Sequence, residues 1–267
     1  MMTTATNPSI TQAPIHPSLA TSDLERARRW YGDKLGWDPV AELPGTLIYR
    51  LGDSGFSVYT TPSAGTARNT VMNWNVDDLT SLMSQLKGRG VTFEDYDFGE
   101  FKTVDGVMTD PTGGKTAWFK DPDGNTIAIL EAPPGQGSGH TFTAMLAASD
   151  LERAKRWYAE KLGYEPVAEY GGMVLDYVSG NTAFNVYQTD FAGTAKNTVA
   201  VWGLRGIRDE VAKLRARGIE FPDFDFGDGD KSEGGIMSDD QGDLQAWFQD
   251  SEGNWLALAE DRGDIPL

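Results

Sequence analysis

The 267-residue sequence contains no cysteine and only two histidines, His16 and His140. The absence of cysteine excludes disulfides, thiolate metal sites and a cysteine nucleophile, and nothing points to an oxidising compartment. A catalytic divalent metal with about three protein ligands would therefore need imidazole and carboxylate ligands. Because histidine is so scarce, we predict that the protein uses no metal, and we expect no other cofactor.

Positive charge and long apolar runs are also scarce. The 23 Lys and Arg residues stand against 40 Asp and Glu residues, which gives a formal net charge of −17. This charge opposes binding to the phosphates of nucleic acids. No run reaches the roughly 20 apolar residues that span a membrane, and the first residues lack the basic and apolar parts of a signal peptide. We expect a cytoplasmic protein with neither a nucleic-acid nor a membrane partner.

The most informative feature that is present is a repeated helix. SDLERARRWYGDKLGW begins at Ser22, and SDLERAKRWYAEKLGY begins at Ser149. In both copies, Ser followed by Glu three residues later predicts a capping box, and apolar residues at helical spacing predict a buried stripe. Gly36 and Gly163 predict left-handed helix ends. Other segments match too, such as TAWFKDPDGN and QAWFQDSEGN, so the chain is a tandem duplication.

Strand and helix patterns follow the same order four times. Residues 16–20, 37–41, 46–51 and 56–61 are predicted strands around the first helix. From residue 70 the order restarts, with a helix that begins at Asp77 or Asp78 and strands at 70–76, 91–98, 115–119 and 125–130. Each half therefore contains two βαβββ modules, and the predicted fold class is α+β. We expect a flexible N-terminal arm (1–14), two domains (15–131 and 142–262) and a linker (132–141).

The RRWY…KLG helix, the VDDL helix start and the DPDGN turn before the last strand, all in a duplicated βαβββ frame, resemble the vicinal oxygen chelate superfamily. This superfamily includes glyoxalase I, bleomycin-binding resistance proteins, fosfomycin-modifying enzymes and extradiol dioxygenases. The resemblance covers residues 16 to 260. It implies curled, mixed β-sheets around a cup and a pseudo-dimer of two domains within one polypeptide. We therefore expect a monomer, or a further homodimer of such chains.

In metal-using relatives, the ligands lie on the first and last strands of the modules and point into the cup. The resemblance places these positions at His16, Ser57, Val71 and Ala128 in the first half, and at Thr143, Asn185, Val199 and Ala257 in the second. Only His16 has a typical ligand side chain, and both alanines stand where relatives have glutamate. Glu131 and Glu260 lie three residues beyond the alanines, so strand alternation puts them on the opposite face, where we expect them to face solvent.

Residues that share a face with these positions predict the lining of the cup. His16 could act as a general base or hydrogen-bond donor, or could be the relic of an ancestral ligand position. The predicted ligand-binding residues are Tyr59, Asn73, Trp118, Thr143, Met145, Asn185, Tyr187 and Trp255, although any of them could instead be core packing. An apolar and aromatic lining with a few neutral polar groups suits a hydrophobic or aromatic small molecule.

Several functions fit this lining. The first is a metal-independent protein, similar to the bleomycin-resistance proteins, that binds and sequesters a toxic compound. The alternative is an enzyme such as a lyase or isomerase, either metal-free with His16 or metal-dependent with misaligned ligands. An inert scaffold is a third possibility. The acidic loops at 95–106 and 223–235 lack the spacing of an EF-hand and are predicted to be solvated hairpins or gating loops.

Overall fold

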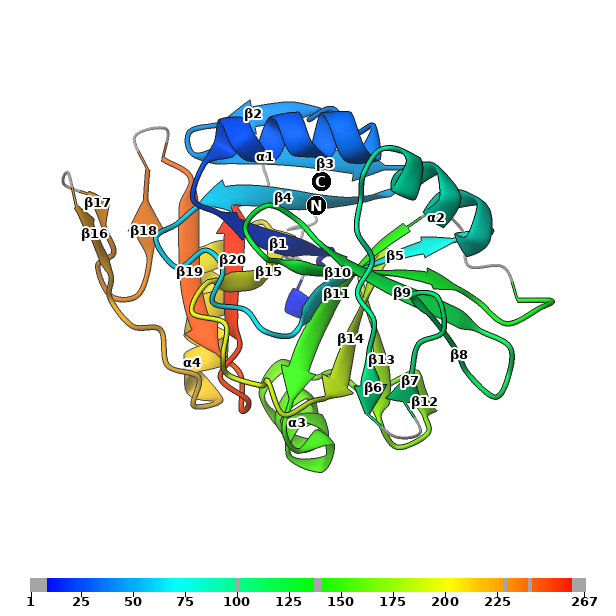
Figure 1. Cartoon of the computed structure of the whole chain (residues 1–267). Coiled ribbons are helices and arrows are strands. Elements are labelled where there is room, and N and C mark those ends of the chain that lie inside the picture. Colours follow the sequence, from blue (N-terminus) through cyan, green and yellow to red (C-terminus); the bar gives the residue numbers. More distant parts are fainter. Residues whose placement is uncertain (1–8, 99–100, 137–140, 228–229, 240–241, 261–267) are drawn as a thin grey trace, which may run out of the picture.

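The computed structural model describes residues 9–98, 101–136, 141–227, 230–239 and 242–260. In this part of the chain, two curled, mixed, eight-stranded sheets lie against each other, and helices cover one face of each (Figure 1). This arrangement confirms the α+β class and the tandem duplication. No helix in the described part of the chain is both long and apolar enough to cross a membrane.

The first sheet contains eight strands in the order β18-β19-β20-β15-β1-β4-β3-β2. Their bounds, in that order, are Met237–Ser238, Leu244–Gln249, Trp255–Glu260, Thr198–Leu204, Ile15–Thr21, Ser54–Thr60, Thr46–Leu51 and Ala41–Leu43. The second sheet has the order β12-β13-β14-β11-β5-β10-β9-β8. Its bounds are Ala168–Tyr170, Val174–Ser179, Thr182–Gln188, Thr141–Ala148, Thr70–Val76, Thr126–Glu131, Lys115–Lys120 and Val107–Thr109.

Each sheet is shared between the two halves of the chain. β1 pairs antiparallel with β15, and β5 pairs antiparallel with β11. The first module therefore shares a sheet with the fourth, and the second with the third, whereas the sequence analysis grouped the cup positions by half. Alone, a module leaves the edge of its first strand unpaired, so it must acquire a partner strand. All four modules offer similar first strands, and local sequence patterns do not specify which two pair.

In the described part of the chain, four α-helices pack on the faces of the sheets that carry the core residues: α1 (Leu24–Trp30), α2 (Leu79–Gly88), α3 (Leu151–Trp157) and α4 (Ile207–Ala216). A π-helical turn follows α1 at Tyr31–Leu35 (η2) and follows α3 at Tyr158–Leu162 (η3). These turns end at Gly36 and Gly163, with φ values of 76° and 84°. The predicted left-handed helix ends are thus confirmed.

The predicted capping boxes are wrong. The N-cap of α1 is Asp23, whose carboxylate accepts a hydrogen bond from the Arg26 backbone N–H at 3.0 Å. Ser22 instead donates from its backbone N and its hydroxyl to Asp123, in the turn before β10. The second half repeats this arrangement with Asp150 as the N-cap. Aspartate caps helices as well as serine does, and the serine is held by a distant turn that local pattern does not reveal.

Two of the predicted strands match β3 and β5 in full, but two others are largely wrong. Residues 37–40 form no strand, because the Trp37 ring lies in the core, 4.5 Å from Trp74 and 5.0 Å from Phe142 between centroids. Residues 91–96 contribute only a bridge from Phe93 to Phe119. The acidic loops form the expected hairpins, β6 (Asp97–Phe98) with β7 (Phe101–Lys102), and β16 (Asp225–Gly227) with β17 (Asp230–Lys231).

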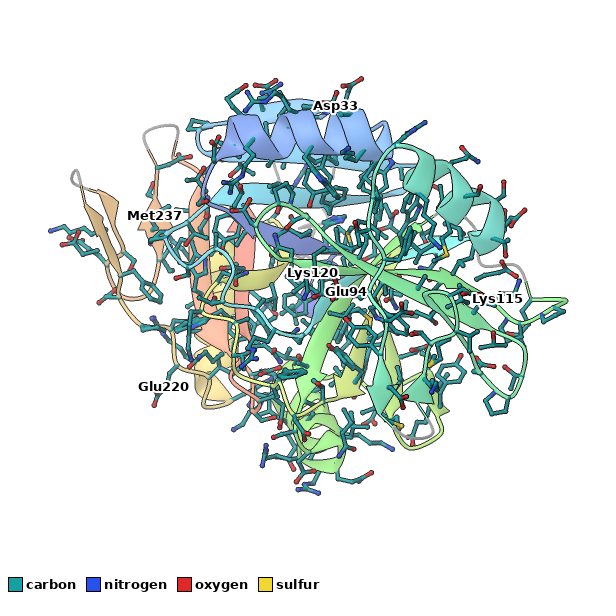
Figure 2. All side chains as sticks on the ribbon, viewed as in Figure 1. Asp33, Glu94, Lys115, Lys120, Glu220 and Met237 are labelled. Atoms are coloured by element: carbon teal, nitrogen blue, oxygen red, sulfur yellow. The ribbon has the colours of Figure 1, made fainter. Side chains whose placement is uncertain are left out.

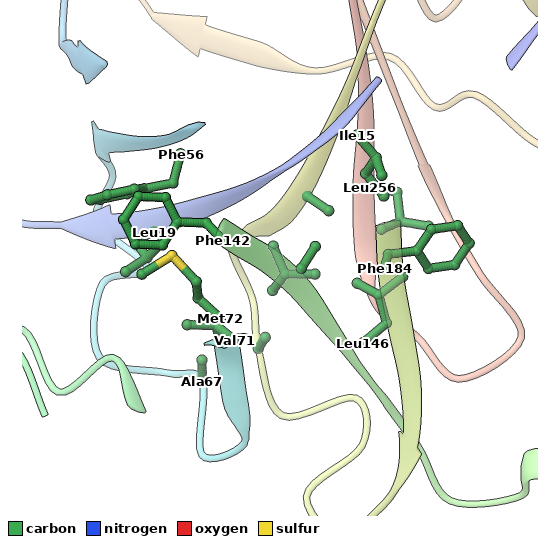
Figure 3. Packing of buried hydrophobic residues seen from close by; sticks show 14 of the residues in the cluster. Ile15, Leu19, Phe56, Ala67, Val71, Met72, Phe142, Leu146, Phe184 and Leu256 are labelled. Atoms are coloured by element: carbon green, nitrogen blue, oxygen red, sulfur yellow. The ribbon is translucent and has the colours of Figure 1, made fainter. Parts of the chain in front are cut away.

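The helix-covered faces of the two sheets meet back to back in one core (Figure 3). Phe142 of the second sheet lies beside Leu19 and Phe56 of the first, and its ring centroid is 4.8 Å from that of Phe56. Phe184 of the second sheet packs edge to face on Trp202 of the first, with ring centroids 6.0 Å apart. Since all of these residues belong to one buried cluster, the two sheets stabilise each other.

The predicted N-terminal arm is wrong from Ser9 onward. A 3₁₀ turn at Ile10–Gln12 (η1) packs against the second half of the chain, and Ile10 is only 1% exposed. The Tyr164 hydroxyl donates to the Ile10 carbonyl at 2.8 Å, and Ser179 donates to the Ala13 carbonyl at 2.7 Å. One isoleucine in a polar run carries too little hydrophobic signal to predict this docking. Residues 1–8 and 137–140 lie outside the described residues.

A buried aspartate fixes the turn before the last strand of the second module, and its repeat does the same in the fourth. The Tyr31 hydroxyl donates to Asp121 at 2.9 Å, and Asn125 donates to the same carboxylate at 2.7 Å. Tyr158 donates to Asp250 in the same way. Burial, the largest of the contributing effects, raises the pKa of the Asp121 and Asp250 carboxyl groups to about 6.

Because the pKa values of these two carboxyl groups are raised in the folded chain, we predict that the protein becomes more stable as pH falls from about 7 to about 5. Between pH 3.8 and about 6, they are protonated in the folded chain but ionised in the unfolded chain. Their contribution is therefore complete below pH 3.8 and lost as pH rises through about 6. We expect the free energy of unfolding in urea to rise by about 1 kcal/mol for each carboxyl group.

The double variant Asp121→Asn, Asp250→Asn is the control, because it removes both titrations. Asp123 and Glu252 have lowered pKa values, so they remain ionised at pH 5 and do not oppose the effect. An equal rise in the variant and in the unmodified protein would contradict the prediction.

Candidate ligand-binding site

The faces of the two sheets that point away from the helices carry most of the predicted site residues. We call them the first and second concave faces, after their sheets. On the first, a row of cross-strand partners runs through Trp247, Ala257, Val201 and His16. On the second, the equivalent row runs through Trp118, Ala128, Asn73 and Thr143.

The first concave face combines a buried polar floor with an aromatic end. His16 is 2% exposed and Ser18 is 3% exposed. The Ser57 hydroxyl donates to the Ser18 hydroxyl at 2.9 Å. At the other end of the row, the half-buried rings of Trp247 and Trp255 both meet Phe224 edge to face, with centroids 5.9 and 5.3 Å away.

The second concave face is more polar. Asn73, Met145, Thr143 and Trp118 are all at least nine-tenths buried. The Asn75 amide, also on this face, donates to the Thr143 hydroxyl at 2.9 Å. Tyr96, from the segment that leads into β6, packs edge to face on Trp118 with centroids 5.5 Å apart.

Asp176 adds a carboxylate that the sequence analysis missed. It lies on β13 directly opposite Asn185 of β14, and it accepts a hydrogen bond from the Asn185 amide. Burial raises its pKa, while its hydrogen bonds to Asn185 and Tyr170 act in the opposite direction. Strand alternation was the available signal, because Asp176 stands between Leu175 and Tyr177, which point into the core.

Tyr59 and Tyr187 are each hydrogen-bonded to the backbone of a strand two places away in the same sheet. The Tyr59 hydroxyl accepts from the Thr198 N–H at 2.7 Å, and the Tyr187 hydroxyl accepts from the Thr70 N–H at 2.7 Å. Burial raises the pKa of Tyr187 to about 12. Both tyrosines thus hold the start of a strand that comes from the other half of the chain.

The structure therefore divides the predicted site residues between two faces. His16, Tyr59 and Trp255 lie on the first concave face, and the other predicted ligand-binding residues lie on the second: Asn73, Trp118, Thr143, Met145, Asn185 and Tyr187. Val71 and Val199, two residues before the rows, are fully buried in the core cluster. A ligand role for each of these residues stays a prediction.

Comparison with known proteins agrees with this architecture. Residues 13–129 match the model of the Glyoxalase/Bleomycin resistance protein/Dioxygenase superfamily. The second half repeats both the sequence motifs and the fold of this region. The first half of the chain, at residues 13–129, belongs to the glyoxalase/bleomycin resistance protein/dioxygenase superfamily.

Two solved structures share the fold of this chain over nearly its full length. Glyoxalase I from Zea mays has a TM-score of 0.64 at 14% sequence identity, and the match covers 96% of this chain and 92% of that one. A putative dioxygenase from Bacillus subtilis has a TM-score of 0.59 at 14% identity, with coverage of 96% and 87%. At these identities the similarity shows the fold alone. No curated protein matches the sequence.

The residues present do not fit the metal site expected of metal-using members of this superfamily. The partners of His16 in its row are Val201 and Ala257, which offer no ligand atoms. Among the described residues, no group of three or more His, Cys, Asp or Glu side chains could hold a metal ion. His140 lies outside those residues.

Glu131 and Glu260 lie on the helix side of their strands, as strand alternation predicts, but they do not simply face solvent. Glu131 accepts from the Leu79 N–H at the start of α2, at 2.8 Å, and pairs with Lys115 (labelled in Figure 2) at 2.7 Å. Glu260 accepts from the Gly206 N–H at the start of α4, at 3.0 Å. Both satisfy helix N-termini, which is a structural role.

Two surface pockets lie outside the concave faces. One, of about 350 Å³, is lined by the start of α4 together with Leu244 and Glu260. The other, of about 460 Å³, lies between Lys87, Phe93 and Gly106. Neither contains a predicted site residue.

From these two hydrogen bonds we predict that Tyr59→Phe and Tyr187→Phe each make the folded protein less stable. Each variant leaves a backbone N–H without its acceptor, so we expect each to lower the free energy of unfolding by about 1 kcal/mol. Urea denaturation measures the change. Tyr49→Phe is the matched control, because the buried Tyr49 hydroxyl has no hydrogen-bond partner in the described part of the chain. A loss of stability in Tyr49→Phe but not in Tyr59→Phe or Tyr187→Phe would contradict the structural role of these two hydroxyl groups.

Proposed function

We propose that the concave faces bind a hydrophobic or aromatic small molecule without a metal, and that the protein sequesters this compound. The observation that carries the proposal is the lining of the first concave face. Its row contains the small or apolar side chains of Val201 and Ala257 between His16 and an aromatic cluster. Such a surface offers stacking and shape rather than charge or metal ligands.

The dimensions of this face suit a small aromatic ring system. The row crosses four adjacent strands, and a strand spacing of about 4.8 Å gives it a length of about 14 Å. Trp247 and Trp255 are both half-buried, so part of each ring remains available for stacking. Ser18 and Ser57 supply neutral hydroxyl groups at the floor.

The assembly and location that we propose follow from the same features. Because strands of one polypeptide complete both sheets, the pseudo-dimer is whole within a single chain, which supports a monomer. The lack of cysteine and the net charge of −17 support a cytoplasmic protein that does not bind nucleic acid.

An enzyme that uses His16 as a general base is the alternative. The observation that favours it is the position of His16, whose imidazole lies buried on the floor of the first concave face next to Ser18. Such an enzyme would convert its ligand, whereas a sequestering protein would release it unchanged.

Neutral acridine, a planar three-ring compound, tests the proposal by equilibrium dialysis and tryptophan quenching. We expect binding that EDTA does not change, with acridine recovered intact by mass spectrometry. Val201→Trp fills the first concave face and should weaken this binding at least tenfold. The matched control is Val167→Trp, since Val167 is 65% exposed and lies outside the row.

Three results would argue against metal-free sequestration. The first is equal affinity in both tryptophan variants. The second is a stoichiometric divalent metal, found by elemental analysis, that binding requires. The third is turnover of the bound compound that is lost in His16→Ala, which would favour the enzyme.

A further inference from the structure

The second concave face carries a carboxylate without a positively charged partner. Asp176 is half-buried, and its hydrogen-bond partners are the neutral Asn185 and Tyr170. No described Lys or Arg forms an ion pair with it, and no cation contributes to its pKa. A half-buried carboxylate without a cation loses solvation that a positively charged ligand could restore.

Two amide groups of the second concave face, Asn185 beside Asp176 and Asn75 on β5, have carbonyl oxygens that accept no hydrogen bond from a described residue. Asn185 must turn its N–H₂ group toward the carboxylate, so its carbonyl oxygen remains without a protein donor. Asn75 likewise donates its N–H₂ group to the Thr141 carbonyl and the Thr143 hydroxyl. These commitments leave the carbonyl oxygens of Asn185 and Asn75 as hydrogen-bond acceptors on this face.

Asn73 provides a second, independent sign of a ligand. It is only 7% exposed and lies on the concave side of β5, opposite Thr143. Its side chain forms no hydrogen bond with any residue that the structure describes. Neither amide atom of Asn73 is among the fully buried polar atoms that lack a partner, so both reach solvent and are accessible to a polar group of a bound molecule.

An apolar floor separates these polar groups. Met145 lies on β11 between Asn185 and the β5 strand that carries Asn73, and Ala147 lies two residues further along β11. Methionine sulfur makes favourable contacts with aromatic rings. The distance from β13 to β5 is three strand spacings, or about 14 Å along the sheet, which accommodates a fused-ring compound with a polar substituent.

We propose that the second concave face binds a planar aromatic cation, with its ring on Met145, its charge against Asp176 and its N–H groups bonded to Asn185 and Asn73. This inference rests on the proposed function and specifies the ligand class for one of the two faces. The first concave face differs at the equivalent positions, because Ile48 corresponds to Asp176 and Val201 corresponds to Asn73. Only the second face therefore selects for charge.

Three acridines of one shape test the proposal: cationic 9-aminoacridine, neutral acridine and anionic acridine-9-carboxylate. We expect 9-aminoacridine to bind the unmodified protein at least tenfold more tightly than the carboxylate. Asp176→Asn should reduce the affinity for 9-aminoacridine at least tenfold and leave acridine binding unchanged. Asn73→Val, which copies the first concave face, should reduce the affinity for 9-aminoacridine at least threefold.

Asp33→Asn is the matched control for net charge. Asp33 is exposed on the helical segment at the top of Figure 2, on the first module, and should have no effect on binding. Equal effects of Asp33→Asn and Asp176→Asn would show non-specific attraction by the acidic surface and overturn the inference. Equal affinity for the cation and the anion would also overturn it.

The same experiment separates this inference from the proposed function. If acridine binding remains sensitive to Val201→Trp but the cation shows no dependence on Asp176, the inference is wrong and the proposed function stands. If acridine does not bind but the binding of 9-aminoacridine depends on Asp176, the proposed role of the first concave face is wrong and the inference stands.

Discussion

The antiparallel pairing of β1 with β15, repeated by β5 with β11, joins the two halves of the chain into one fold. Each pairing covers the open edge of one module with a strand from the other half. The concave rows exist only because of these pairings, since His16 and Val201 come from opposite halves. The back-to-back core then fixes the two sheets, and the tyrosine contacts at Thr70 and Thr198 fix the chain segments that enter them.

Duplication has preserved the structural contacts and changed the linings. Tyr31 with Asp121 is repeated by Tyr158 with Asp250, at the same distance of 2.9 Å. By contrast, the position of Ile48 on one concave face is that of Asp176 on the other. Residues that hold turns and strands in place are thus shared, whereas residues that would touch a ligand differ. This difference supports two faces with distinct chemical preferences on one scaffold.

The sequence predicted the modules because their signals are local. Alternation marked β3 and β5, and Gly36 marked a helix end. It could not predict which modules share a sheet, because that choice depends on strand edges far apart in the chain. The docking of Ile10 and the bond from Ser22 to Asp123 are long-range for the same reason. Asp176 could have been found by alternation, but its hydrogen bond with Asn185 required the register of β13 and β14.

Disulfide trapping tests the shared sheets most directly, because the chain has no cysteine of its own to interfere. His16 lies opposite Val201, so a His16→Cys, Val201→Cys variant should form an intrachain disulfide on mild oxidation. The comparison variant is His16→Cys, Asn73→Cys, whose positions would be partners if each half formed its own cup. Our account predicts a bond in the first variant and none in the second, as seen by thiol counting and peptide mapping. The opposite result would contradict it.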